Sequence, residues 1–195
     1  MVFGLRLAFN ECEVEGLERL AGGCRLEFLG FVVPLDSGKV VDSLRGNGDV
    51  GKMEFGVLQV LLKHYAKSEP VERAGRLVKF ADLPGGYAYE KAFLQRAVQP
   101  VAEAFGDEPD KLVECVERLG GHALTFGDCS VEVPALPHLP LTIIVWRRSE
   151  FPTQANILYD QTANNYLPTE DLAVLGELTT VRIFQALNTS ARKEL

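Results

Sequence analysis

The sequence predicts an α+β fold in which helices pack on an antiparallel meander sheet. Two runs of alternating apolar residues within 122–133 flank Gly127-Asp128, a pattern typical of a two-residue hairpin. The apolar stretch 141–146 and the shorter run 155–159 follow at spacings that suit consecutive antiparallel strands. Helical patterns precede and follow this block, so strands and helices are segregated along the chain, as in α+β proteins.

The hairpin also predicts a register. Pairing across its turn places His122 opposite Val133, Leu124 opposite Val131 and Phe126 opposite Cys129 on one buried face. The stretch 141–146 is apolar without alternation, which predicts a central strand covered on both sides.

Helices are predicted in the first half of the chain. Residues 11–21 form one that ends at Gly22-Gly23, and 53–67 form another with a broad apolar face. Between 89 and 105 apolar residues recur every four positions, but Pro100 removes a backbone donor, so a kink or two abutting helices are expected.

Shorter elements complete the expected fold. Residues 24–28 alternate like a half-buried strand, and 31–35 and 39–42 flank a turn as a hairpin. Asp107 is predicted to cap a helix that Gly120 ends.

The final helix is predicted to begin near Thr169. Its apolar residues recur every three positions and therefore drift around the helix. We expect it to be largely enclosed, either by the core or by a partner.

Composition limits the classes of function. The chain has 195 residues, 47% of them hydrophobic and 24% charged, which fits one domain over residues 1–195. A formal net charge of −7 without a basic tract argues against nucleic-acid binding. No stretch has the length of a membrane span or the pattern of a signal peptide, so a cytoplasmic protein without a membrane partner is expected.

Metal and nucleotide sites are not indicated. The four cysteines form no C-x-x-C pair and are not grouped with histidines, so no metal centre is predicted, and no cofactor is identified. The stretch 46–52 has the glycine and lysine spacing of a P-loop. Met53 stands where Ser or Thr would hold Mg²⁺, and Asp49 puts a negative charge among the expected phosphates, so we interpret the stretch as an ordinary glycine-rich loop.

The meander sorts its loops to two ends of the sheet. At one end the chain places an imidazole, a carboxylate, two amides and a phenol: His138, Asp160, Asn164, Asn165 and Tyr166. Such groups can bind a polar ligand, and an Asp that orients a His can tune general-base chemistry. The alternative is structural, since Asp and Asn are common turn-forming residues.

The opposite end carries a second candidate cluster: Asp128, Arg147, Arg148 and Glu150. Its arginines could bind an anion, but a solvated group of ion pairs is the interpretation we favour. His64 and His122 are interpreted as core or edge residues, and Trp146 as core.

The chain from Leu61 onward, roughly two-thirds of it, resembles the domain-of-unknown-function family 3786. The order of several short motifs carries the resemblance: Leu119-Gly120-Gly121, Phe126-Gly127-Asp128, Pro134-Ala135-Leu136-Pro137, Leu139-Pro140-Leu141, Trp146 with Glu150-Phe151-Pro152, and Ile157-Leu158-Tyr159-Asp160 with Tyr166-Leu167-Pro168.

The resemblance implies an origin in anaerobic bacteria or archaea and no established activity. It also implies an association of some members with small iron–sulfur domains and corrinoid metabolism. In this chain such an association would require a partner, because no cluster-binding cysteine motif is present. Arg147-Arg148-Ser149 stands where the family leads us to expect more acidic residues.

Three hypotheses follow. The leading one is a binding or accessory protein that takes a small-molecule or cofactor-related ligand at the His138 end of the sheet. The second is a metal-independent hydrolase or lyase with His138 as base, Asp160 as its orienter and Tyr166 as donor. The third is a protein-interaction module whose C-terminal helix contacts a partner, or a second copy through Leu175 and Phe184.

Overall fold

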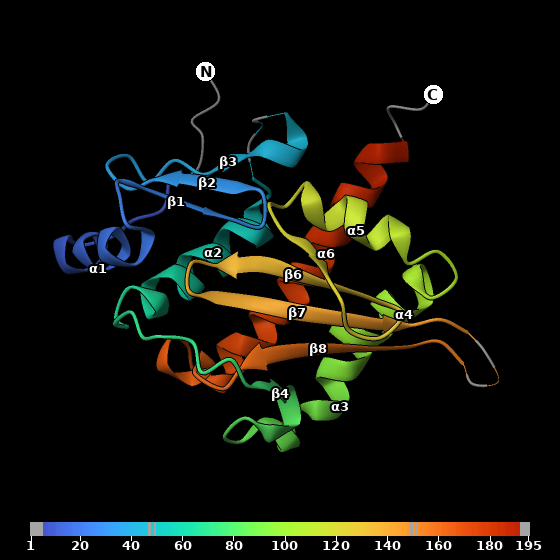
Figure 1. The fold of residues 1–195 in the computed structure, drawn as a ribbon. Helices are drawn as coiled ribbons and strands as arrows, with labels where there is room; N and C mark the ends of the chain where they lie inside the picture. Colours follow the sequence, from blue (N-terminus) through green and yellow to red (C-terminus); the bar gives the residue numbers. More distant parts are fainter. Residues whose placement is uncertain (1–5, 47, 49, 149, 151, 192–195) are drawn as a thin grey trace.

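The computed structural model describes residues 6–46, 48, 50–148, 150 and 152–191. They form two antiparallel sheets with helices around them, which confirms the predicted α+β class (Figure 1). The helices are α1 Glu11–Ala21, α2 Lys52–Tyr65, α3 Glu90–Phe93, α4 Gln99–Phe105, α5 Asp110–Glu117 and α6 Thr169–Ala191. The strands are β1 Arg25–Phe28, β2 Phe31–Pro34, β3 Val41–Asp42, β4 Leu77–Lys79, β5 His122–Leu124, β6 Cys129–Leu136, β7 Leu139–Trp146 and β8 Gln154–Asp160.

The larger sheet has the strand order β4-β8-β7-β6-β5, and β6, β7 and β8 form the predicted meander. Strand β7 is central and nearly continuously buried, as its unbroken apolar run predicts. Helices α2, α4 and α6 lie behind the sheet in Figure 1. The Tyr159 hydroxyl of β8 donates a hydrogen bond of 2.8 Å to the Leu172 carbonyl of α6, which ties the helix layer to the sheet.

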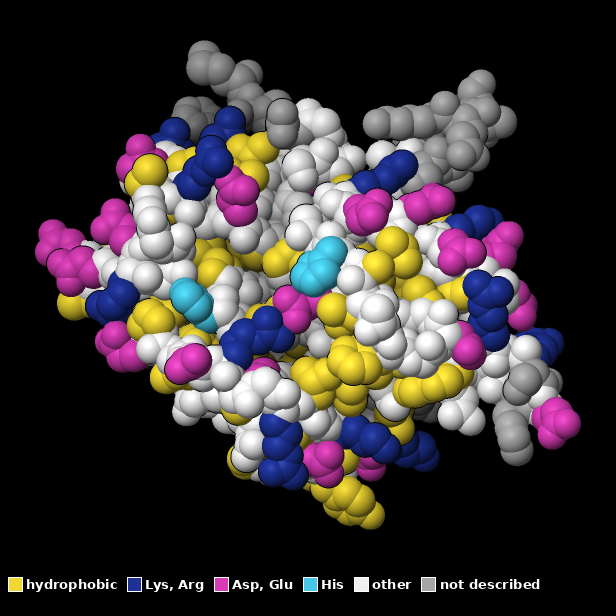
Figure 2. Space-filling view, viewed as in Figure 1, with side chains coloured by type: hydrophobic (Ala, Val, Ile, Leu, Met, Phe, Trp, Pro, Cys, Tyr) yellow, Lys and Arg dark blue, Asp and Glu magenta, His cyan; other side chains and the backbone are white. Residues whose placement is uncertain are grey.

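The other face of this sheet has no helix over it (Figure 1). Hydrophobic side chains gather on this face between scattered acidic and basic ones (Figure 2). Strand alternation assigns Ile144, Trp146 and Leu158 to it, and Trp146 is only half-buried rather than core. The larger sheet is therefore covered by helices on one side only.

The predicted register of the β5–β6 hairpin is wrong by one residue. His122 pairs with Glu132 and Leu124 with Ser130. The Ser130 hydroxyl accepts the Phe126 N–H at 2.7 Å, a bond that a two-residue turn would give to the backbone. Because a one-residue slip exchanges the faces of a strand, His122 is exposed and Phe126 remains 49% accessible.

Two further details differ from the sequence prediction. Strand β4 is not predicted, since three residues are too few for a pattern, yet it pairs with the end of β8. Asp107 does not cap α5, which begins after Pro109; its carboxylate lies 3.9 Å from the Arg148 guanidinium instead.

The expected irregularity at Pro100 is confirmed. A π-helical turn, Leu94–Val98, joins α3 to α4 and ends two residues before the proline. The wider turn keeps Phe93, Ala97 and Val101 buried at four-residue spacing while the helix accommodates the missing N–H.

The smaller sheet, β1-β2-β3, packs beside α1, whose start and stop follow the sequence closely. The Asn10 side chain accepts the Glu13 N–H, and the Glu13 carboxylate accepts the Asn10 N–H, each at 2.9 Å. Gly22 ends the helix in the left-handed conformation, with φ of 65°.

Helix α6 is enclosed in large part by the rest of the chain. Leu175 is fully buried, and Phe184 is half-buried with its ring centroid 6.0 Å from that of Phe105. Val174 and Val181 are exposed. A surface of α6 open to a partner would therefore present the valines rather than Leu175.

A fully buried ion pair joins α6 to the smaller sheet. The Arg182 guanidinium donates to both carboxylate oxygens of Asp42, at 2.7 and 2.8 Å, and both side chains are 0% exposed. Its Nε donates to the Leu29 carbonyl at 2.8 Å, and the guanidinium stacks 3.9 Å from the Phe31 ring centroid. Every group that burial would otherwise leave uncompensated therefore has a partner.

We expect Arg182→Ala to lower the free energy of unfolding by about 3–5 kcal/mol, because it leaves the Asp42 carboxylate buried without its countercharge. Chemical denaturation followed by circular dichroism measures this loss. The double variant Asp42→Leu/Arg182→Met should recover most of it, since no lone charge remains. A single variant as stable as the wild type would contradict the assigned role of the pair.

Candidate functional site

The structure brings the predicted residues of the His138 end together but gives several of them structural bonds. Asp160, at the end of β8, is buried and accepts four hydrogen bonds. Its Oδ1 accepts from the Thr162 N–H, the Thr162 hydroxyl and the Ala74 N–H, and its Oδ2 accepts from the Gly75 N–H, at 2.7–3.0 Å. Burial opposes the charged form, but these bonds outweigh it and hold the pKa of Asp160 below its ordinary value of 3.8.

Tyr166 also forms hydrogen bonds to the segment that Asp160 holds. Its buried hydroxyl accepts the Val71 N–H at 3.0 Å and donates to the Val71 carbonyl at 2.9 Å. The Arg73 guanidinium pairs with Glu132 of β6 at 2.7 Å. The segment 71–76, which we call the strap, is therefore fastened to the larger sheet and its following turn by Asp160, Tyr166 and Glu132.

His138 is one of two exposed members of the group, together with Asn165. It occupies the β6–β7 turn with φ of 62°, a conformation that a non-glycine residue adopts at a cost. Its ring lies nearly parallel to that of Tyr166, with 6.3 Å between the centroids. Within the described residues it forms no hydrogen bond to Asp160, so the predicted His–Asp arrangement is not formed by these two side chains.

Asn164 has one satisfied and one unsatisfied end. Its Nδ2 donates to the Thr169 hydroxyl at 3.0 Å and to the Leu167 carbonyl at 3.3 Å. Its Oδ1 is buried and has no hydrogen-bond partner among the described residues. The neighbouring Asn165 is exposed. An unpaired buried acceptor costs free energy, and a donor such as water or a ligand would remove that cost.

A hollow of about 520 Å³ lies against Asn164, and we call it the Asn164 hollow. Its wall combines polar and apolar residues: Arg76, Val78, Asp82, Leu83, Pro84, Gln161 and Asn164. The Arg76 and Gln161 side chains form no hydrogen bond or ion pair within the described part of the chain, so their donors are free to bind a ligand. The Asp82 carboxylate accepts one bond, from the Lys79 N–H at 3.2 Å.

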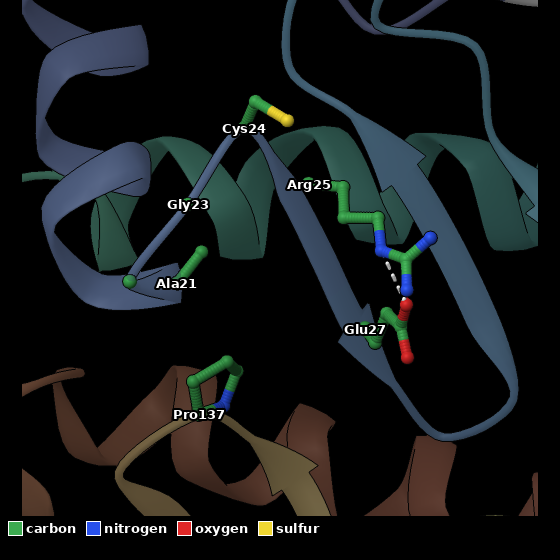
Figure 3. Close-up of a pocket in the computed structure, with 7 residues that line it drawn as sticks. Ala21, Gly23, Cys24, Arg25, Glu27 and Pro137 are labelled. Atoms are coloured by element: carbon green, nitrogen blue, oxygen red, sulfur yellow. Dashed lines mark ion pairs between the residues drawn. The ribbon is translucent and has the colours of Figure 1, made fainter.

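A second hollow, of about 600 Å³, lies on the other side of the β6–β7 turn (Figure 3). In Figure 3 Pro137 faces Cys24 of the α1–β1 connection, and Arg25 and Glu27 of β1, across this hollow. Arg25 and Glu27 form an ion pair of 2.7 Å with each other, and the Tyr65 hydroxyl donates to the Pro137 carbonyl. The charged groups of this hollow are therefore already paired.

A His–Asp pair does occur in the structure, between residues the sequence did not connect. The Nδ1 of His64, near the end of α2, contacts the carboxylate of Asp171, in the first turn of α6. An acid at a helix N-terminus and an imidazole at a C-terminus suit both helix dipoles. They lie 107 residues apart, so no local pattern could reveal the pair.

The second predicted cluster lies at the opposite end of the sheet. The Asp128 carboxylate accepts the Arg147 N–H at 2.9 Å. The guanidinium groups of Arg147 and Arg148 lie 3.7 and 3.9 Å from carboxylates of Asp110 and Asp107, and all four side chains are exposed. Glu150 is exposed as well, while Ser149 lies outside the described residues. The arrangement is one of solvated charges.

The described residues offer few other candidate sites. They contain no group of three or more His, Cys, Asp or Glu side chains placed to hold a metal ion. None of their helices is long and apolar enough to cross a membrane. In the P-loop-like stretch, Asn47 and Asp49 lie outside the described part, and Gly51 precedes α2 with its N–H donated to Glu54 at 3.1 Å.

Comparison with protein families settles the resemblance. The sequence model of the family described as Domain of unknown function (DUF3786) matches residues 13–182. The chain belongs to this family. The match begins well before Leu61, so DUF3786 also includes the smaller sheet and reaches Arg182. Comparisons with curated proteins and with solved structures find no match.

In this DUF3786 member, Asp160→Asn should destabilise the strap, because an amide cannot accept all four hydrogen bonds. We expect a loss of about 1–3 kcal/mol at neutral pH and faster hydrogen exchange at the Ala74 and Gly75 amides. Since the folded-state pKa of Asp160 is lowered, its stabilisation is present above its ordinary value and is lost as pH falls through the folded-state pKa.

The variant should therefore show a smaller loss of stability on acidification than the wild type. Unfolding curves at neutral and acidic pH measure both effects. Asp128→Asn, at an exposed carboxylate that accepts one backbone N–H, is the matched control. Unchanged exchange at Ala74 and Gly75 would show that Asp160 does not hold the strap.

His138→Gly should not destabilise the protein, because glycine adopts a positive φ without the cost that a side chain carries. Thermal unfolding measures the difference, with His122→Gly on the exposed edge strand as the control. A large loss of stability in His138→Gly alone would show that the stacking on Tyr166 outweighs the backbone cost.

Proposed function

We propose that the chain is a binding or accessory protein that holds a small polar molecule in the Asn164 hollow. The observation that carries the proposal is the buried Asn164 Oδ1, which has no partner among the described residues and belongs to a residue lining this hollow. Buried acceptors are nearly always satisfied in folded proteins. Because the Oδ1 has almost no accessible surface, a small turn of the Asn164 side chain toward the hollow would bring it to a ligand donor, directly or through one ordered water.

The chemistry of the wall suggests the class of ligand. Asn164 Oδ1 requires a hydroxyl or amino donor. The exposed Arg76 guanidinium, which has no ion pair in the described structure, favours a carboxylate or another oxyanion. The Asn164 hollow, at about 520 Å³, falls within the usual size of small-molecule sites. These features together favour a small hydroxy or amino carboxylate.

The other two hypotheses receive less support. Asp160 accepts its four hydrogen bonds from the strap and Thr162, and within the described residues it forms none with His138. A hydrolase or lyase that uses His138 and Asp160 as a catalytic pair is therefore less well supported than ligand binding. A partner surface on α6 would have to use Val174 and Val181, since Leu175 is enclosed.

We expect one or more of glycolate, lactate, serine and aspartate to raise the melting temperature and to bind in isothermal titration calorimetry. Arg76→Ala should weaken binding by about tenfold or more, because it removes a charge-assisted contact. Gln161→Ala should weaken it less. Arg96→Ala, another exposed arginine that is absent from the wall of the hollow, is the matched control.

The proposal fails if none of the four compounds binds, or if Arg76→Ala binds as the wild type does. Both variants alter exposed side chains, so retained circular dichroism spectra would show that a loss of binding is local.

A further inference from the structure

Strand β8 has an outer edge that is only partly paired. Strand β4 pairs with Leu158, Tyr159 and Asp160 and then ends at Lys79, so the half of β8 from Gln154 to Ile157 has no strand beside it in the described structure (Figure 1). An edge of this kind presents backbone N–H and C=O groups that template a further strand.

The direction of the backbone N–H groups at the β8 edge follows from a hydrogen bond next to this edge. The Gln161 N–H donates to the Arg76 carbonyl at 2.9 Å, on the β4 side. Backbone N–H groups alternate in direction along a strand. The N–H groups of Ala155 and Ile157 therefore point to the same side of β8 as that of Gln161. Ala155 is half-buried, and β4 does not reach it.

A hollow of about 170 Å³ adjoins this edge, and we call it the edge hollow. Asn156 and Ile157 form one wall, and the other walls come mostly from apolar residues of the β4–α4 region: Lys79, Phe80, Ala81, Glu90, Phe93, Leu94 and Val98. Phe80 and Phe93 stack with ring centroids 4.4 Å apart, and Leu94 is 41% exposed. The volume suits one large apolar side chain.

We propose that an extended peptide segment of a partner protein adds to the β8 edge as a strand and places one apolar side chain in the edge hollow. Main-chain hydrogen bonds to β8 supply the affinity, and the hollow selects the anchoring side chain, which is the general logic of strand addition. Lys79 and Glu90, one of each sign beside the hollow, favour polar residues next to the anchor.

A second copy of this chain fits the edge less well. Symmetric pairing of two β8 edges would offer the hollow only Gln154, Ala155 and Asn156, because Ile157 is already buried in its own core, and none of these three is a large apolar residue. A partner segment with alternating polar and β-branched residues and one aromatic residue satisfies both the backbone edge and the hollow.

The test uses a labelled octapeptide of alternating threonine and valine with a central phenylalanine and a lysine at each end. Fluorescence anisotropy measures its binding to the full chain. Ala155→Pro removes an outward N–H while leaving the pairing with β7 intact, as proline is tolerated at a sheet edge, and should weaken binding by about tenfold or more. Leu94→Glu, at the rim of the hollow, should weaken it similarly.

Val181→Glu, on the exposed side of α6, is the matched control and should bind as the wild type does. A peptide with aspartate in place of the phenylalanine should not bind. In amide NMR spectra, the Ile157 signal should shift on addition of the binding peptide. These results together would support strand addition.

Three results would overturn the inference: no binding of the phenylalanine peptide, unchanged binding by folded Ala155→Pro, or a concentration-dependent dimer that Ala155→Pro abolishes. The last would assign the edge to a second copy. None of these variants alters a residue of the Asn164 hollow, so the outcome is independent of the proposed ligand.

Discussion

The buried pair of Arg182 and Asp42 is the constraint on which the arrangement of the two sheets depends. Asp42 ends β3 of the smaller sheet, and Arg182 lies on α6, the helix that covers the back of the larger one. A charge at zero exposure is tolerated only where its partner is correctly placed, so the pair permits few relative positions of sheet and helix. Gln185 and Glu54 extend it, since Gln185 accepts from Arg182 at 2.6 Å and donates to Glu54 at 2.7 Å. The same bonds therefore connect α2 as well.

The other end of the sheet is organised by a similar need. The strap has no regular secondary structure, so its backbone groups depend on side chains for partners. Asp160 and Tyr166 provide them, which explains why a polar constellation stands where β8 ends. Asp160 and Tyr166, which resemble a catalytic group in the sequence, instead hold the strap in place by hydrogen bonds. Asp160 and Tyr166 have hydrogen-bond partners within the described residues, whereas the amide oxygen of Asn164 has none. The ligand proposal rests on this difference.

The sequence predicts the parts of the fold that local patterns determine. The central position of β7 follows from its unbroken apolar run, and the irregular helix at Pro100 from a missing donor. The β5–β6 register does not follow, because one hydroxyl, that of Ser130, shifts the turn by a residue. Nor do the pairs of Arg182 with Asp42 and of His64 with Asp171, which join positions 140 and 107 residues apart. Strand direction alone predicts that the loops of the candidate site lie at one end of the sheet. The bonds of Asp160 do not follow, because they depend on a strap that no sequence pattern marks.

The two proposed sites of association share one short element. β4 contributes Val78 to the Asn164 hollow and Lys79 to the edge hollow, and its end at Lys79 leaves half of β8 without a neighbouring strand. A longer β4 would pair the rest of β8 and close its edge, so the brevity of this strand keeps the edge accessible. Natural sheets avoid leaving an edge and an apolar hollow side by side, because the combination invites association. Its presence here is most simply explained if association at this edge is part of what the chain does.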